Sequence, residues 1–154
     1  MSSSEHTIVW ATDGSPAATA AFEEAQRLFS DSRFVAVHYD QRMTGRAGSY
    51  PVLADEQDIR AAISARIDEL RHGGLDIELV IPVGHDTAAD AIAEVAREVN
   101  ADSIVCGTRG LGAFSGVLLG SVAQRLVHVA PCAVLAVPDR VLAARAPQPQ
   151  TAQA

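Results

Sequence analysis

The sequence predicts an α/β fold: a single three-layer α/β/α domain around a five-stranded parallel sheet. Two observations support this prediction. Five short apolar runs, rich in Val, Ile or aromatic residues, recur along the 154 residues, and segments with helical spacing of apolar residues separate them. Most of the runs are continuous rather than alternating, which is typical of strands buried on both faces of a parallel sheet.

The apolar runs are the expected strands. They cover residues 6–12, 34–39, 77–83, 103–106 and 132–137. A helical segment follows each of the first four, and this alternation implies right-handed crossovers with helices on both faces of the sheet. We therefore expect a Rossmann-like topology with strand order 3-2-1-4-5, in which the last strand lies at one edge of the sheet.

The first two helices have clear start and stop signals. Ser15 is a favourable N-cap and Pro16 fits the first helical position, so we expect the first helix to begin there and to run to about Phe29. The second helix is expected over residues 55–72, because isoleucines recur there at helical spacing and two glycines follow directly.

Sequence signals also mark the third and fourth helices. Thr87 and Asp90 have capping-box spacing, which predicts the start of the third helix. The fourth is expected to end before Pro131 and to carry an apolar face made of Leu118, Leu119, Val122, Leu126 and Val129. Residues 43–53 are expected to form a long internal loop. From about Asp139 the chain becomes rich in Ala, Pro and Gln, so we expect one domain over residues 1–138 and a disordered tail over 139–154.

Composition excludes several classes of function. All 12 basic residues are arginine, against 19 acidic residues, for a net charge of −7. Without lysine there is no lysine-dependent phosphate loop and no Schiff-base chemistry. A net negative chain is not expected to bind nucleic acid. No signal peptide is evident, and no apolar stretch approaches the ~20 residues that span a bilayer, so we expect a cytoplasmic protein with no membrane partner. Cys106 and Cys132 are expected to be reduced core thiols.

Polar residues gather where the expected strands end. In an open parallel sheet, ligands bind at the carboxyl ends of the strands, near the point where the strand order reverses. The segments expected at those ends are Thr12-Asp13-Gly14, His38-Tyr39-Asp40, Val83-Gly84-His85 and Gly107-Thr108-Arg109-Gly110. His38 and His85 have no partner at metal-ligand or catalytic-triad spacing, so a structural or solvated role is favoured over catalysis.

Glycine is concentrated after the fourth strand. Five of the 11 glycines lie within residues 107–122, between a strand and a helix. In that context backbone N–H groups can converge on a phosphate, and glycines let a ligand approach the backbone. Ser121 adds a hydroxyl donor and Arg109 a nearby cation. The alternative is a flexible glycine turn without a ligand.

The spacing of Gly107, Gly110, Gly120 and Ser121 resembles the nucleotide-loop signature of the universal stress protein (UspA-type) family, in its ATP-binding subgroup. The first strand and turn, over residues 8–15, and the closing helix and strand, over residues 118–122 and 130–137, are similar to the same family. The resemblance covers about residues 6–138. It implies an adenine nucleotide alpha hydrolase-like fold, ATP as the ligand, with any Mg²⁺ or Mn²⁺ held by the phosphates, and a homodimer formed through the last strand, from Cys132 to Val137.

The residues and the resemblance together give the candidate nucleotide-binding set. Its members are Ala11, Thr12, Asp13, Gly14, Tyr39, Val83, Gly84, Gly107, Arg109, Gly110, Gly112, Gly120, Ser121 and Val122. In this family the position matching Tyr39 is usually a small aliphatic residue that borders adenine. A tyrosine there can stack on the base or crowd it.

No catalytic residue and no metal site made of side chains are expected. There is no G-x-S-x-G elbow, and neither Ser115 nor Ser121 has a base that the sequence reveals. The leading hypothesis is therefore an ATP-binding, nucleotide-responsive stress regulator. Two alternatives stay open: a slow ATP-hydrolysing enzyme in which Asp13 or His85 positions water, and an interaction module that binds another adenine nucleotide, such as a cyclic one.

Overall fold

The computed structural model describes residues 6–40, 55–109 and 119–138. It contains one sheet of five parallel strands in the order β3-β2-β1-β4-β5, which confirms the predicted fold and strand order. The strands are β1 (Thr7–Ala11), β2 (Arg33–Val37), β3 (Ile77–Val80), β4 (Ser103–Gly107) and β5 (Ala133–Val137). The helices are α1 (Pro16–Leu28), α2 (Asp55–His72), α3 (Ala88–Glu98) and α4 (Ser121–Val129).

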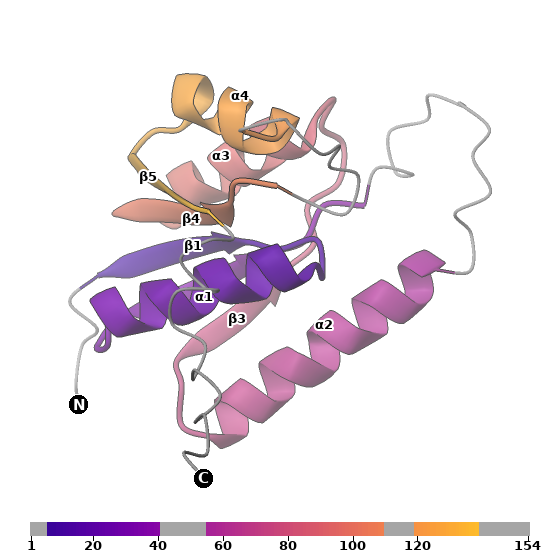
Figure 1. Ribbon diagram of the computed structural model, residues 1–154, viewed down its shortest axis with the longest axis vertical. Helices are drawn as coiled ribbons and strands as arrows, with labels where there is room; N and C mark the ends of the chain where they lie inside the picture. Colours follow the sequence, from indigo (N-terminus) through magenta and orange to yellow (C-terminus); the bar gives the residue numbers. More distant parts are fainter. Residues whose placement is uncertain (1–5, 41–54, 110–118, 139–154) are drawn as a thin grey trace, which may run out of the picture.

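Two helical layers enclose the sheet. Helices α1 and α2 lie on one side and α3 and α4 on the other (Figure 1). The central strand β1 pairs with β2 on one side and with β4 on the other. Because both faces of β1 are covered, its residues from Ile8 to Ala11 are all buried, which explains the continuous apolar run.

The core under α1 and α2 is built on aromatic side chains. The ring of Phe22 on α1 lies between Trp10 of β1 and Phe34 of β2, with ring centroids 4.5 and 5.2 Å away. The indole N–H of Trp10 donates to the carbonyl oxygen of Ala18, at 2.9 Å, so the one polar atom of this buried ring is satisfied. Ile63 and Ile67 of α2 complete this layer.

The core under α3 and α4 is built on small and branched aliphatic side chains. Ala89, Ile92, Val95 and Ala96 of α3 pack against the opposite face of β1, β2 and β4, together with Leu126 of α4. The N-caps of α1 and α3 are those predicted. The hydroxyls of Ser15 and Thr87 accept the backbone N–H groups of Ala18 and Asp90, both at 3.2 Å.

Some predicted boundaries are wrong by a few residues. The third strand ends at Val80 rather than at residue 83, because Pro82 lacks a backbone N–H for the ladder. The second strand ends at Val37, and the fifth begins at Ala133. The fourth helix begins at Ser121, so Leu119 packs against the core from a position before the helix. Leu118 lies outside the described residues, as do the predicted loop over 43–53 and the predicted tail over 139–154.

Cys106 is buried and Cys132 half-buried, and both are free thiols. Burial raises the pKa of the Cys106 thiol to about 11, so this group is a neutral thiol at physiological pH. None of the helices in the described ranges is long and apolar enough to cross a membrane.

Candidate functional site

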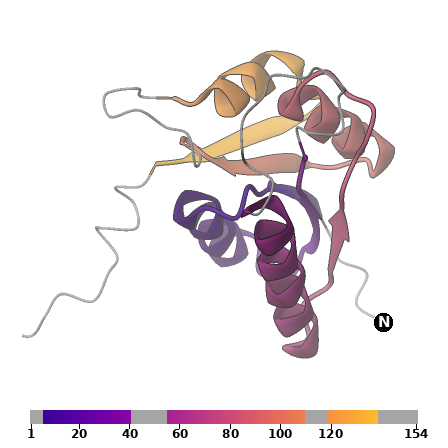
Figure 2. The same ribbon diagram turned by 90° about the vertical axis from the view of Figure 1, so that its right-hand side faces the viewer.

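The strand order reverses between β1 and β4, the point at which open α/β sheets bind ligands. From β1 the chain moves outward to β2 and β3, and then it crosses back to β4 and β5 on the other side. Figure 2 views the molecule from the side at which β1 ends. The edge at which the strands end, here called the carboxyl edge, therefore brings the residues after β1 next to those after β4, although 96 positions separate Ala11, the end of β1, from Gly107, the end of β4.

The turn that follows β1, over residues 12–15, is tightly hydrogen-bonded. The Thr12 N–H donates to the carbonyl oxygen of Val37 at 2.9 Å, which continues the ladder beyond the strand. The Thr12 hydroxyl accepts the N–H of Gly14 at 3.2 Å, and the Asp13 Oδ1 atom accepts the N–H of Ser15 at 2.9 Å. Gly14 has φ +79°, a left-handed conformation that glycine adopts without strain. Asp13 thus orders its own turn, as a capping carboxylate does.

The residues that follow β4 are held mainly through the backbone. The Thr108 N–H donates to the carbonyl oxygen of Val137 at 3.1 Å, and the Gly120 N–H donates to the carbonyl oxygen of Thr108. The second bond brings the start of α4 against the end of β4. The structure therefore places Gly120 against Thr108, the residue after Gly107, while Gly110 and Gly112 lie outside the described residues.

The two described glycines of this segment are needed for close contacts within the protein. A Cβ at Gly107 would lie 3.1 Å from the carbonyl carbon and oxygen of Ala17 in α1. A Cβ at Gly120 would lie 3.2 Å from the carbonyl oxygen of Thr108. Neither glycine has a positive φ. What both positions require is close packing of backbone on backbone, not a left-handed conformation.

Helix α4 begins at the carboxyl edge without a side-chain cap. Its N-cap residue is Gly120, which has no side chain to accept the first N–H groups of the helix, and Ser121 is exposed. The first amides of a helix have no partner within the helix and carry the positive end of its dipole. The start of α4 therefore has the chemistry that binds an anion, and the hydroxyl of Ser121 lies beside it.

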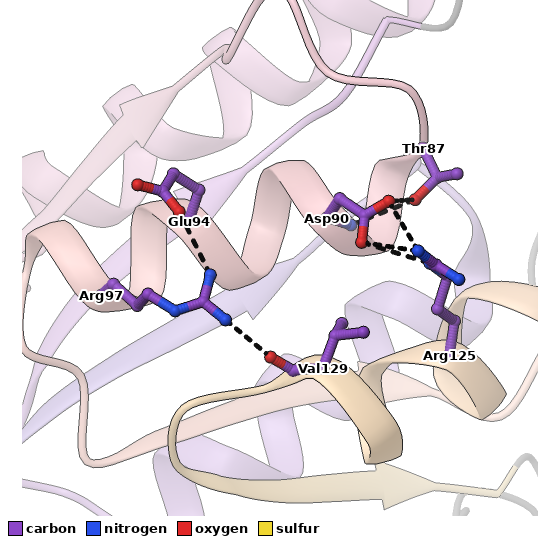
Figure 3. A network of polar contacts seen from close by, with 6 residues as sticks. All are labelled: Thr87, Asp90, Glu94, Arg97, Arg125 and Val129. Atoms are coloured by element: carbon purple, nitrogen blue, oxygen red, sulfur yellow. Dashed lines mark hydrogen bonds and ion pairs between the residues drawn. The ribbon is translucent and has the colours of Figure 1, made fainter.

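Two arginines fix α4 against α3 (Figure 3). The guanidinium of Arg125 donates from Nη2 to both carboxylate oxygens of Asp90, at 3.0 Å each. The hydrogen bond from the Thr87 hydroxyl and the one from Arg125 hold the pKa of Asp90 below its usual range. Arg97 of α3 donates to the carbonyl oxygen of Val129, at 3.0 Å, near the end of α4. Arg125 is the middle residue of α4 and Val129 its last, so the two contacts join the middle and the end of this short helix to α3.

Tyr39 is tied to the loop that contains Val83 and Gly84, on the β2–β3 side of the carboxyl edge. The hydroxyl of Tyr39 donates to the backbone carbonyl of His85, which ties the end of β2 to the loop after β3. Val83 is a large apolar residue that is 57% exposed, and Gly84 has φ +81°. The hydroxyl of Tyr39 thus anchors its ring to the loop after β3. The exposed Val83 belongs to the same loop.

Sequence reasoning missed one buried pair at this edge. His38 is 4% exposed, and its Nε2 atom lies 2.6 Å from Oε1 of Glu56 on α2. Glu56 lies 18 residues further along the chain, in a helix with many exposed charges, and no local signal marks it. A structural role for His38, favoured by the sequence, agrees with its burial. Within the described ranges, no group of three or more His, Cys, Asp or Glu side chains could hold a metal ion.

Comparisons with known proteins agree with this geometry. A profile of the universal stress protein family matches residues 5–138. A universal stress protein of Thermus aquaticus is 33% identical over 135 residues, which cover 85% of this chain and 97% of the relative. A solved structure of a universal stress protein in complex with cAMP is 31% identical, with a TM-score of 0.60, and the match covers 88% of this chain and 98% of that one. A universal stress protein of Archaeoglobus fulgidus in complex with dAMP is 23% identical over 87% of this chain and 98% of its own, with a TM-score of 0.60, a likeness of fold alone.

Proposed function

The chain belongs to the universal stress protein family, and from this premise we propose that it binds an adenine nucleotide at the carboxyl edge of β1 and β4. The observation that carries the proposal is the meeting of two segments at the switch point. One is the ordered turn after β1, and the other is the start of α4, whose first amides have no side-chain cap from Gly120. The relative that is 31% identical and is solved with cAMP supports the same ligand class.

We further propose that the nucleotide is ATP, held by the glycine segment between β4 and α4. Gly107, Gly110, Gly120 and Ser121 keep the full spacing of the family's nucleotide loop. The uncapped start of α4 and the exposed Ser121 fit a phosphate, because helix N-termini favour anions. Any Mg²⁺ or Mn²⁺ would be bound through the phosphates.

Calorimetric titration with ATP, AMP and cAMP tests the choice of ligand. ATP binding at least tenfold tighter than that of AMP supports phosphate recognition by the glycine segment. Equal or tighter binding of cAMP supports the alternative of a cyclic nucleotide, which the relative solved with cAMP favours. A parent protein that binds none of the three overturns the proposed function.

The side chain of Tyr39 determines how the adenine base fits in the proposed site. If its ring stacks on adenine, Tyr39→Ala should weaken binding by about 1–3 kcal/mol, the range of base–aromatic stacking. If the ring crowds the base, the same change should tighten binding. Tyr39→Phe is the matched control, because it keeps the ring and removes only the hydrogen bond to the His85 carbonyl. An affinity that does not change in Tyr39→Ala would show that this residue does not touch the base.

We assign the protein a regulatory role in the cytoplasm rather than efficient catalysis. The Asp13 carboxylate accepts the N–H of Ser15, as a capping group does, and the Cys106 thiol is neutral at physiological pH. The alternative, a slow ATPase, requires turnover that survives purification and disappears in Asp13→Asn. Turnover that persists in that variant points to a contaminating enzyme.

We also propose that β5 pairs with a second copy of the chain. Strand β5 lies at the edge of the sheet, next to β4, and an apolar edge strand is a template for pairing. The carbonyl of Val137 accepts from Thr108, so Val137 faces β4 and the N–H of Ala136 faces the free edge. Ala136→Pro should therefore give a folded monomer by light scattering and circular dichroism. A monomeric parent at micromolar concentration, or a dimeric Ala136→Pro, excludes this interface.

A further inference from the structure

His38 connects two elements of the carboxyl edge. It lies directly after β2, and its side chain is 4% exposed. Its Nδ1 atom lies 3.0 Å from the backbone carbonyl oxygen of Thr12, in the turn after β1. Its Nε2 atom lies 2.6 Å from Oε1 of Glu56, in the first turn of α2. One buried ring therefore joins the β1 turn to the start of α2.

The two hydrogen-bond partners of the His38 ring determine where protons must lie. A backbone carbonyl oxygen can only accept, so Nδ1 must carry a proton. An ionised carboxylate also only accepts, so the bond to Glu56 needs a second proton, located on Nε2 or on the carboxyl group. Both ring nitrogens of His38 therefore have a hydrogen-bond partner. A charge-assisted bond of this kind is stronger than a neutral one, and it fixes the orientation of the ring.

Helix α2 also contacts the same turn directly. A Cβ at Gly14 would lie 3.1 Å from Cγ2 of Ile59 and 3.7 Å from Cδ1 of Ile63, so the first turns of α2 lie against Gly14. The carbonyl of Thr12 and the backbone of Gly14 are thus both set by groups that α2 positions, one of them through His38. Contacts from His38 and α2 therefore stabilise the turn after β1, in addition to the turn's own hydrogen bonds.

We propose that His38 is a positioning residue that sets the turn over residues 12–14 for nucleotide binding, and that Glu56 acts on this turn through His38. The proposal rests on the proposed function, since the turn is one half of the candidate nucleotide site. Its physical basis is that a buried carbonyl with a fixed donor keeps its peptide plane, and the orientation of the following Asp13 and Gly14 depends on that plane.

Two substitutions separate the hydrogen bond of His38 to the Thr12 carbonyl from its hydrogen bond to Glu56. The side-chain nitrogen of asparagine is attached to Cγ, as Nδ1 is, so His38→Asn keeps a donor for the Thr12 carbonyl and loses Glu56. The side-chain nitrogen of glutamine lies one atom further out, as Nε2 does, so His38→Gln keeps a partner for Glu56 and loses the Thr12 carbonyl. Both variants lose the ring, and this makes each the matched control of the other.

The readouts are ATP affinity by calorimetry and the exchange rates of the Gly14 and Ser15 amide hydrogens in the free protein. Both amides are hydrogen-bonded within the turn, to Thr12 and Asp13, so their exchange reports its order. We expect His38→Gln to bind ATP at least tenfold more weakly and to exchange both amides at least tenfold faster. His38→Asn should stay within about threefold of the parent in both measurements. Circular dichroism and the fluorescence of Trp10 confirm that each variant is folded.

Glu56→Gln provides a rescue test. A glutamine amide can donate to Nε2 of a neutral imidazole, so this variant should keep the ring in place and bind ATP nearly as the parent does. Glu56→Ala leaves Nε2 without this partner and should move toward His38→Gln in both measurements.

Equal losses in His38→Asn and His38→Gln overturn the proposal, because the ring then acts only as packing. The reverse order, with His38→Asn weaker, also overturns it, because the anchoring of α2 would then dominate. Amide exchange that differs while the two affinities stay equal overturns the link to the nucleotide. If the parent binds no nucleotide, the proposed function fails, and the exchange rates alone still decide whether His38 orders the turn.

Discussion

The turn after β1 and the segment between β4 and α4 lie on either side of one switch point and are built in different ways. In the β1 turn, side chains make the structure: the Thr12 hydroxyl and the Asp13 carboxylate accept backbone N–H groups, and His38 holds the Thr12 carbonyl. After β4 two hydrogen bonds join backbone to backbone, and a Cβ at Gly107 or Gly120 would be crowded. A site can therefore be ordered by adding polar side chains or by removing side chains altogether.

The largest effect is expected at Gly107. In Gly107→Ala the new Cβ would lie 3.1 Å from backbone atoms of Ala17, which cannot rotate away. We expect the free energy of unfolding to fall by about 1–3 kcal/mol, as in overpacked cores. Urea denaturation followed by Trp10 fluorescence measures it.

Ser103→Ala is the control on the same strand. The Ser103 hydroxyl is buried and has no hydrogen-bond partner among the described residues, so its removal should leave stability unchanged or raise it. A Gly107→Ala protein as stable as the parent would contradict the contrast between the two halves of the site.

Gly14 should show the next largest effect, for a different reason. Gly14→Ala places a side chain at φ +79°, which costs about 1–2 kcal/mol in the left-handed region. Gly84→Ala is the matched control, because Gly84 has φ +81° and a Cβ at that position would meet no atom within 4 Å. The difference between the two losses, measured by thermal and urea unfolding, is the contribution of the contact with Ile59. Equal losses would mean that Ile59 yields freely and that α2 does not constrain the turn.

Gly110→Val extends the comparison to the glycine segment. Its β-branched side chain should block the approach of a phosphate to the backbone and lower ATP affinity at least tenfold, about 1.4 kcal/mol, with the fold intact. Calorimetry measures the affinity, and Ala113→Val in the same segment controls for the added bulk. ATP binding by Gly110→Val at the parent's affinity would remove the glycine segment from the site.

The smallest effect is expected at Arg125. Arg125→Gln removes an exposed ion pair with Asp90, and such pairs contribute little and are screened by salt. The pKa of Asp90 should rise in the variant, because the hydrogen bond and the charge of Arg125 both lower it, as Thr87 and His85 also do. Since the pKa is lowered in the folded protein, the stabilisation is present above the unfolded-state pKa and is lost as the pH falls through the folded-state pKa. Carboxyl titration by NMR measures the shift, and an unchanged Asp90 pKa would mean that Thr87 and His85 lower it without Arg125.

Local signals explain most of the agreement between the predicted and the observed fold. The caps at Ser15 and Thr87 were predictable because each depends on atoms three residues away. The errors in the predicted boundaries arise because the same local signals extend beyond the ends of the elements. Val83 continues an apolar run but is exposed, since Pro82 ends the ladder first, and Leu119 fits the helical spacing but precedes the helix that starts after Gly120.

The candidate site was predictable only in part. The polar residues at the strand ends and the spacing of the glycines are visible in the sequence. Parallel pairing brings those strand ends together. The pairing of His38 with Glu56, and the crowding of Gly107 by Ala17, depend on how α1 and α2 lie across the sheet. No spacing rule predicts such contacts, because the distance between two helix surfaces is set by all the side chains packed between them.

The sequence by itself determined the order of elements, the parallel sheet with β1 at its centre, and the concentration of glycine after β4, because each follows from local periodicity and residue type. The tertiary structure alone decided which glycines are required by backbone contact, which arginines hold α4 on α3, and which carboxylate meets the buried His38. The physical reason is that strand and helix formation depend on neighbouring residues, whereas a buried polar group takes whatever partner the completed packing brings within hydrogen-bond distance.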